Sequence, residues 1–166
     1  FIEDFAGDMV ADMERVEVSK PSAGRSEQVH YSLYERMPYR GRSGSYTLPI
    51  PAWMLSEGTR RLTAIFALLS HSPPPSLLCI EEVENGLDPW AVVILLGHLQ
   101  SASDRGTQVL ITTHSPWLLD HVPLDAIIQV RREQGETSYE RFAHRRAIKA
   151  YAAEIPAGTR YVQEDE

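Results

Sequence analysis

Two short apolar runs give the chain its first recognisable elements. Leu77-Leu78-Cys79-Ile80 is the first, and it leads straight into two adjacent carboxylates, Glu81 and Glu82. A run this short and this apolar predicts a fully buried strand, with its cysteine as a small buried hydrophobe. Residues 109–112 form the second run, which also leads into polar residues. Ligands of an open α/β sheet bind at the carboxyl ends of its strands, so the residues after both runs are candidates for chemistry.

Helical periodicity precedes and separates these strands. Residues 56–70 carry apolar side chains at helical spacing, and Ser56 is a suitable N-cap for that helix. Asp88 and Pro89 open a second helix as its N-cap and first helical residue, and Ser115-Pro116 opens a short third one. The alternation of strand and helix from residue 77 onward predicts parallel pairing in a layered sheet.

Alternating apolar and polar positions predict antiparallel hairpins on either side of this core. One hairpin is expected from strands at 15–19 and 29–36, and a second from strands at 127–131 and 138–142. A loop at 37–45 that contains arginine and glycine should lead into a short strand at 46–50. Helices are expected over 1–14 and 145–153. We therefore expect an α/β fold with a layered, mostly parallel sheet, flanking helices and antiparallel hairpins at the edges. Residues 1–166 are expected to form a single lobe, divided into 1–54, a core at 55–120, and 121–166.

Composition and charge limit the partners and environments that are compatible with this chain. The net charge of −7 means that any nucleic-acid contact requires a local basic patch. The clearest basic stretch is 131–149, which a solvated helix or hairpin face explains equally well. A single cysteine excludes an internal disulfide and a cysteine-type zinc site, and it fits a cytoplasmic protein. No run of 18 apolar residues is present, so we expect no membrane span.

Four short features then follow one another in a fixed order. A helix starts at the first, Leu55-Ser56-Glu57-Gly58-Thr59, and the second is the end of the apolar strand at Glu81-Glu82. The third leads into the next helix and is Glu84-Asn85-Gly86-Leu87-Asp88. The fourth follows the next strand and is Thr113-His114-Ser115. This order resembles the C-terminal half of ABC-type ATPase heads, and in particular the bacterial AAA-family ATPases that are similar to the RecF, OLD and SMC proteins. The resemblance covers residues 55–120, where it identifies a signature motif, a Walker B strand, a D-loop and a switch-histidine loop.

The resemblance implies a role for each motif. Glu81 would hold Mg²⁺ through water, Glu82 would polarise the attacking water, and His114 would contact the γ-phosphate. The signature residues Ser56, Glu57 and Gly58 would serve ATP held by a partner subunit, because free N–H groups at a helix N-terminus favour phosphate. Asp88 would act across a dimer interface.

Structural explanations stand beside these roles. Ser56 and Asp88 are also ordinary N-caps, and His114 on its own would be an ordinary loop histidine. Glu57 replaces the commoner glycine of the signature, and Glu81 replaces the commoner aspartate of Walker B. The tryptophans at positions 53 and 117 are better explained by packing than by base stacking.

One part of such an ATPase has no counterpart here. The phosphate-binding pattern G-x-x-x-x-G-K-[ST] does not occur, and no glycine is followed by lysine anywhere in the chain. The glycine-containing segment 41–45 lacks the lysine. Because the chain also begins at Phe1 within a helical pattern, we expect it to be a piece of a longer protein, inactive alone. The expected partners are an N-terminal P-loop half or a second ATPase subunit, with a homodimer in the complete protein.

Three functions remain open from the sequence. The first is the C-terminal lobe of an ATP-hydrolysing switch protein in DNA repair or phage defence. The second is a metal-dependent nuclease or hydrolase that uses Glu81, Glu82, Glu84 and His114. The third is a scaffold without catalytic activity, which the missing P-loop favours for the chain as printed.

Overall fold

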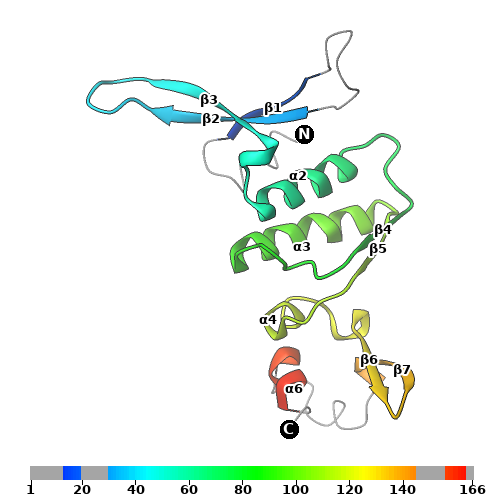
Figure 1. Ribbon diagram of the computed structural model, residues 1–166. Coiled ribbons are helices and arrows are strands. Elements are labelled where there is room, and N and C mark those ends of the chain that lie inside the picture. Colours follow the sequence, from blue (N-terminus) through cyan, green and yellow to red (C-terminus); the bar gives the residue numbers. More distant parts are fainter. Residues whose placement is uncertain (1–12, 20–29, 145–155, 164–166) are drawn as a thin grey trace. The chain divides into compact units, whose positions relative to one another are not determined.

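The computed structural model describes residues 13–19, 30–144 and 156–163, which fall into two compact units. The first unit runs to Ile80 and resumes over Asn85–Ile111, and the second contains Glu81–Glu84 and everything from Thr112 onward. Strands and flanking helices alternate along the chain (Figure 1). The α/β class expected from the sequence is therefore confirmed. Among the described strands, parallel pairing is confined to β4 and β5, since only they are joined by a helical crossover.

A three-stranded antiparallel sheet forms the first part of unit 1. Its strands are β1 (Met13–Ser19), β2 (His30–Pro38) and β3 (Ser45–Pro51), in that order. This confirms the expected hairpin and the short third strand. The helix expected over 1–14 lies almost wholly outside the described residues, and its last two positions belong to β1 instead.

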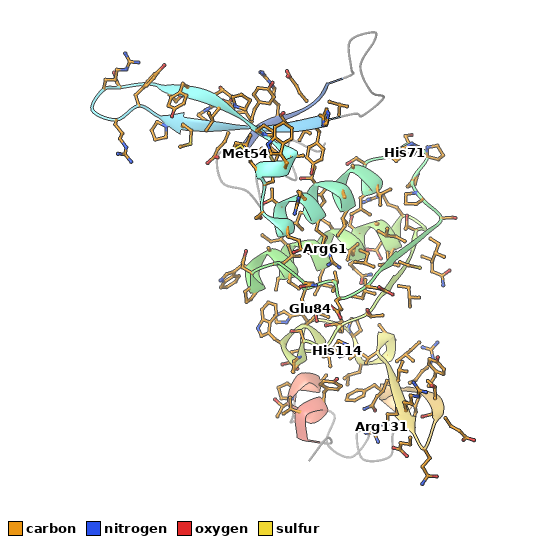
Figure 2. The ribbon with its side chains drawn as sticks, viewed as in Figure 1. Met54, Arg61, His71, Glu84, His114 and Arg131 are labelled. Atoms are coloured by element: carbon orange, nitrogen blue, oxygen red, sulfur yellow. The ribbon has the colours of Figure 1, made fainter. Side chains whose placement is uncertain are left out.

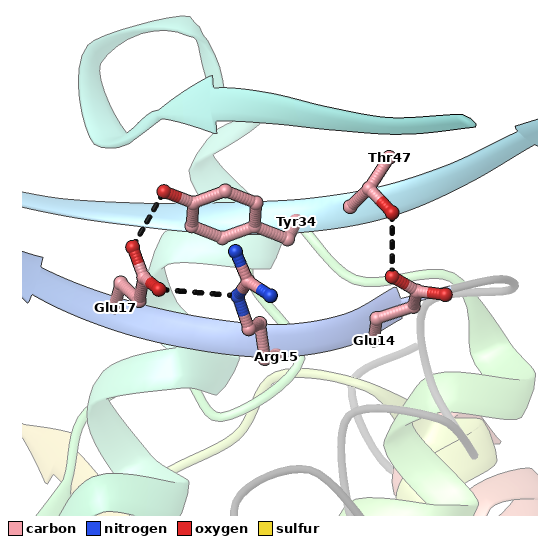
Figure 3. A network of polar contacts seen from close by, with 5 residues as sticks. All are labelled: Glu14, Arg15, Glu17, Tyr34 and Thr47. Atoms are coloured by element: carbon pink, nitrogen blue, oxygen red, sulfur yellow. Dashed lines mark hydrogen bonds and ion pairs between the residues drawn. The ribbon is translucent and has the colours of Figure 1, made fainter.

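Side-chain hydrogen bonds connect these three strands on one face (Figure 3). The Glu14 carboxylate accepts from Thr47 Oγ1 at 2.7 Å and from Arg36 Nε at 2.5 Å, and the hydrogen bond from Thr47, followed by that from Arg36, lowers the pKa of Glu14. Tyr34 donates its hydroxyl to Glu17 at 2.6 Å, which raises the pKa of Tyr34. These exposed contacts fix strand register more than they add stability.

Two helices supply most of the core of unit 1. A short 3-10 turn, η1 (Ala52–Met54), precedes α2 (Glu57–Leu69), and α3 (Pro89–Asp104) follows later in the chain. Each helix buries one apolar stripe, at about 1.5–3 kcal/mol for each fully buried large side chain. The stripes consist of Leu62, Ile65, Phe66 and Leu69 in α2, and Ala91, Val92, Leu95, Leu99 and Ala102 in α3.

The parallel pair consists of β4 (Leu77–Ile80) and β5 (Gln108–Ile111). The expectation of a fully buried β4 is wrong, because burial alternates along the strand: Leu78 and Ile80 are buried, whereas Leu77 is 52% exposed and Cys79 is exposed. Leu110, the register partner of Cys79, is 56% exposed. One face of this two-stranded sheet packs into the core, and no described residue covers the other.

Unit 2 is built from short elements around a small core. They are α4 (Pro116–Leu119), η2 (Leu124–Ala126), the hairpin β6 (Ile128–Glu133) and β7 (Glu136–Arg141), η3 (Phe142–His144) and α6 (Ala157–Gln163). Their core is Ile127, Phe142 and Ala157, with Leu119, Val122 and Leu124 packed against it.

The tail of the chain differs from its predicted structure. The hairpin around Gln134-Gly135 is confirmed, and both residues have positive φ there. The helix expected over 145–153 lies outside the described residues. The helix α6 was not expected, and it packs closely on α4, because a Cβ on Gly158 would lie 1.8 Å from the Pro116 carbonyl oxygen.

Candidate functional site

The two carboxylates after β4 begin a tight turn in unit 2. Glu81 and Glu82 are both exposed, and Glu82 has φ of 45°, a conformation that a residue with a side chain adopts only at a cost. The turn is held in place by Thr112, whose hydroxyl accepts from Glu82 N–H at 2.9 Å and whose carbonyl accepts from Val83 N–H at 3.1 Å. Val83 is fully buried. The residue that follows β5 therefore fixes the position of Glu82.

A second contact joins the same turn to the histidine loop (Figure 2). Glu84 Oε1 accepts a hydrogen bond from the backbone N–H of His114 at 2.8 Å, across 30 residues of sequence. Burial alone would raise the pKa of Glu84, but hydrogen bonds from its own backbone N–H and from that of His114 outweigh it and hold the pKa below the usual value. The second oxygen, Oε2, is buried and has no hydrogen-bond partner among the described residues.

The histidine loop is shaped by backbone contacts, and its side chain is exposed. Ser115 N–H donates to Thr113 Oγ1 at 3.0 Å, and Leu118 N–H donates to Ser115 Oγ at 3.3 Å, which caps α4. The His114 side chain is exposed. Glu81, Glu82 and His114 are thus exposed residues carried by two adjoining loops that hydrogen bonds hold together.

The signature residues lie in unit 1. Ser56 is the N-cap of α2 and accepts from Thr59 N–H at 3.1 Å, while Glu57 is exposed in the first turn. Gly58 is buried, and a Cβ at this position would lie 2.1 Å from the Gly86 carbonyl oxygen. The absence of a side chain at Gly58 therefore has a packing explanation: the first turn of α2 lies directly on the turn before α3.

Asp88 caps α3, as the sequence predicted. Its carboxylate accepts from the N–H groups of Trp90 at 3.0 Å and Ala91 at 3.1 Å, and Pro89 occupies the first turn. Because one carboxylate oxygen makes both contacts, the cap accounts for an acidic residue here without any ligand.

Among the described residues, no three His, Cys, Asp or Glu side chains are arranged to hold a metal ion. The nuclease hypothesis needs such a cluster from Glu81, Glu82, Glu84 and His114, so the geometry gives it no support. Mg²⁺ bound mainly through water and phosphate needs only one or two protein carboxylates, and exposed Glu81 fits that smaller demand.

Sequence reasoning missed two residues of this site. Thr112 and Glu84 make the contacts that join the two loops, yet neither was assigned a role in the ATPase. The available signal was their position: Thr112 directly follows β5 and Glu84 lies four residues after the end of β4, and the carboxyl ends of these parallel strands share one edge of a sheet.

The fold matches the ATPase heads of SMC proteins. A solved structure from work on ATP-driven dimerization and DNA-stimulated activation of SMC ATPases aligns with a TM-score of 0.59 at 16% identity, covering 91% of this chain and 86% of that one. The Smc head domain of Pyrococcus furiosus, solved with the C-terminal domain of ScpA bound, aligns with a TM-score of 0.59 at 19% identity, covering 91% and 36%. The fold is thus that of an ABC- and SMC-type ATPase head.

The chain belongs to the AAA ATPase family described as "AAA domain, putative AbiEii toxin, Type IV TA system", whose model matches residues 3–120. ABC transporter G family member 41 of Oryza sativa subsp. japonica is 25% identical over 147 residues, covering 76% of this chain and 10% of the transporter. The cytochrome c biogenesis ATP-binding export protein CcmA of Bartonella quintana (strain Toulouse) is 31% identical over 90 residues, covering 52% and 42%. The chain therefore spans less than half the length of these relatives. None of its described helices is long and apolar enough to cross a membrane.

Proposed function

We propose that this chain is the C-terminal lobe of an ATP-binding and ATP-hydrolysing switch protein, and that it works in DNA repair or phage defence. The observation that carries the proposal is the pair of joined loops: Thr112 holds Glu82 in its left-handed conformation, and Glu84 holds the backbone of His114. Residues kept in such costly conformations concentrate at active sites. Family membership supports nucleotide chemistry at these loops.

Each loop contributes a different group to the reaction. Glu82 would accept a hydrogen bond from the attacking water and polarise it, and His114 would donate to the γ-phosphate as its charge shifts. Both side chains are exposed at the surface of unit 2, where a nucleotide could reach them. Mg²⁺, once bound with ATP, would be held by Glu81 through water and would offset the phosphate charge.

The signature residues would act on a nucleotide held elsewhere. Ser56, Glu57 and Gly58 surround the N-terminus of α2, where unpaired N–H groups and the helix dipole attract phosphate. The hydroxyl of Ser56 already contacts Thr59, so we assign the phosphate contact to backbone N–H groups as much as to that side chain. Asp88 would contact the partner subunit while it caps α3.

A P-loop half is needed to complete this site, because the chain contains no G-x-x-x-x-G-K-[ST] pattern. We propose that the lobe pairs with a P-loop half and that the completed head forms a homodimer in the cytoplasm upon ATP binding.

Turnover by the completed head tests the proposal. With Mg²⁺ and ATP, the completed head should release phosphate. Glu82→Gln should abolish phosphate release while keeping ATP binding. His114→Ala should slow phosphate release by at least about tenfold. Glu136→Gln, an exposed glutamate of β7, is the matched control and should leave the rate unchanged. Hydrolysis that persists in Glu82→Gln would refute the assignment of that residue, and a completed head without any ATP binding would refute the function.

A further inference from the structure

A segment of unit 1 carries positive charge in a chain that is otherwise acidic. Between Glu35 and Glu57 the sequence contains no aspartate or glutamate, but it contains Arg36, Arg40 and Arg42. The whole chain has a net charge of −7, so this local excess of positive charge runs against its composition. Such a local patch is the feature that nucleic-acid binding would require of this chain.

These arginines lie on a projecting two-stranded ribbon. Within the described residues, β1 pairs with β2 only as far as Glu35, whereas β2 and β3 stay paired through Arg36↔Thr47, Met37↔Tyr46 and Pro38↔Ser45. Figure 1 shows the hairpin end of β2 and β3 extending beyond β1. We call residues 36–47 the basic ribbon. Three paired positions and a six-residue turn give it a reach of roughly 15 Å at about 3.3 Å per residue.

The tip of the basic ribbon is ordered by its own contacts. Tyr39 N–H donates to the Gly44 carbonyl at 3.1 Å, and the rings of Tyr39 and Tyr46 lie 5.3 Å apart. The guanidinium of Arg42 stacks over Tyr39 at 3.8 Å from the ring centroid. At Gly41, with φ of 79°, a Cβ would meet no atom within 4 Å, so its backbone is open to close approach. Little ordering cost therefore remains to be met on binding.

Among the residues that the structure describes, no carboxylate cancels the charges at the tip. Arg36 pairs with Glu14, but Arg40 and Arg42 are exposed and form no ion pair with any residue that the structure describes. The hairpin of β6 and β7 is different, because its arginines alternate with glutamates. Its charged residues are Arg131, Arg132, Glu133, Glu136, Glu140 and Arg141, which sum to zero. The basic stretch expected from the sequence therefore has no net charge along this hairpin. The segment with net positive charge is the basic ribbon.

We propose that the basic ribbon binds double-stranded DNA, with Arg40 and Arg42 on backbone phosphates. A two-stranded ribbon fits the major groove of B-form DNA, which is about 12 Å wide and about 8.5 Å deep. The deep, narrow major groove of duplex RNA does not admit one. Because Arg40 and Arg42 contact phosphates, which carry no sequence information directly, binding is independent of base sequence. This surface is separate from the nucleotide chemistry, and it binds DNA whether or not ATP is present.

A binding titration without nucleotide tests this surface directly. Fluorescence anisotropy of a labelled DNA duplex of about 25 base pairs is followed as the full chain is added, over a range of salt concentrations. Arg40→Ala/Arg42→Ala should weaken binding by at least about tenfold and reduce the slope of log affinity against log salt by about 2, since each lost phosphate contact removes about 0.9. Arg131→Ala/Arg132→Ala removes the same charge from the other hairpin and should bind as the unaltered chain does.

Two further measurements separate charge from folding and shape. Arg40→Lys/Arg42→Lys keeps the positive charge and should keep most of the affinity, and circular dichroism should show equal folding of all variants. The proposal is overturned if the unaltered chain does not bind the duplex, if the alanine pair binds normally, or if the control pair loses as much affinity. Equal affinity for duplex RNA would also overturn it, because that result excludes the groove as the basis of recognition.

Discussion

Glu84 accepts a hydrogen bond from the backbone N–H of His114 at 2.8 Å, although 30 residues separate the two in the sequence. The contact fixes the position of the histidine loop through a carboxylate that has no proposed ligand contact in the ATPase. Together with the hydrogen bonds that Thr112 accepts from Glu82 and Val83, it holds the turn after β4 and the loop after β5 together. A substitution at Glu84 should therefore alter the loop that carries His114.

Removing this carboxylate should loosen the histidine loop. Glu84→Ala is expected to lower the free energy of unfolding by about 1–2 kcal/mol, because the hydrogen bond from the His114 N–H to a charged carboxylate is lost. Hydrogen exchange of the His114 amide should become faster. Glu84→Gln keeps an acceptor oxygen and should lose less stability.

Glu136 is the matched control for that comparison, since it is an exposed glutamate of the same unit. Glu136→Ala should change neither the free energy of unfolding beyond about 0.5 kcal/mol nor the exchange of the His114 amide. Unchanged exchange at His114 in Glu84→Ala would show that the loop is held by other contacts.

Acid should weaken the same contact. The pKa of Glu84 is held below its usual value in the folded chain, so the unfolded chain takes up the proton first as the pH falls. The stabilisation is complete above the unfolded pKa of about 4.3 and is lost as the pH falls through the lower folded value. Urea unfolding between pH 6 and pH 3 should show a steeper loss for the unaltered chain than for Glu84→Gln, and parallel curves would contradict the assignment.

Two glycines should respond in opposite directions to alanine. Gly58→Ala places a methyl group 2.1 Å from the Gly86 carbonyl oxygen, so it should destabilise the chain by about 1–3 kcal/mol or more. Gly97 lies within α3, where a Cβ meets no atom within 4 Å, so Gly97→Ala should stabilise it by about 1 kcal/mol. Thermal melts of the two variants measure both signs, and a neutral Gly58→Ala would mean that the two turns can separate at little cost.

Glu82 should limit stability because of its conformation. Its φ of 45° favours glycine, so Glu82→Gly is expected to raise the free energy of unfolding by up to about 1 kcal/mol while removing the group proposed to polarise water. Glu81→Gly, at the neighbouring exposed position without positive φ, serves as the control and should not stabilise the chain. Equal effects at both positions would argue against strain at Glu82.

The cap of α3 can be separated from any role at a dimer interface. Asp88→Ala should cost about 0.5–2 kcal/mol, because the N–H groups of Trp90 and Ala91 lose their acceptor. Asp88→Ser preserves a capping oxygen and should restore most of that stability without restoring the charge. If the completed ATPase head is impaired equally by both changes, the carboxylate acts beyond the cap; if serine restores activity, the cap is its whole contribution.

Short-range patterns in the sequence were sufficient to predict most of the helices and strands. Ser56 and Asp88 are predicted N-caps because such side chains satisfy N–H groups a few residues away, and the structure confirms both. Ser115-Pro116 is predicted to open a short helix, which the structure also confirms, with Ser115 as its N-cap. The β6 and β7 hairpin followed from Gln134-Gly135 in the same way. Such contacts span only a few residues, so their chemistry can be read along the chain.

Contacts between distant segments were not predictable in this way. Glu84 meets His114, and Gly58 meets Gly86, only after the segments that carry them have packed, and no local spacing encodes either pair. The exposure of Cys79 was missed for a related reason, because an apolar run reports what a strand prefers to contact and not what is present to contact it.

The exposed face of β4 and β5 also makes the chain convenient for chemical probing. Cys79 is the only cysteine in the sequence, and its side chain is exposed on that face beside Leu110. A maleimide dye would therefore attach at one defined place, without any engineered mutation. Its rate of attachment would report, from minute to minute, whether that face is open to solvent or shielded by another polypeptide.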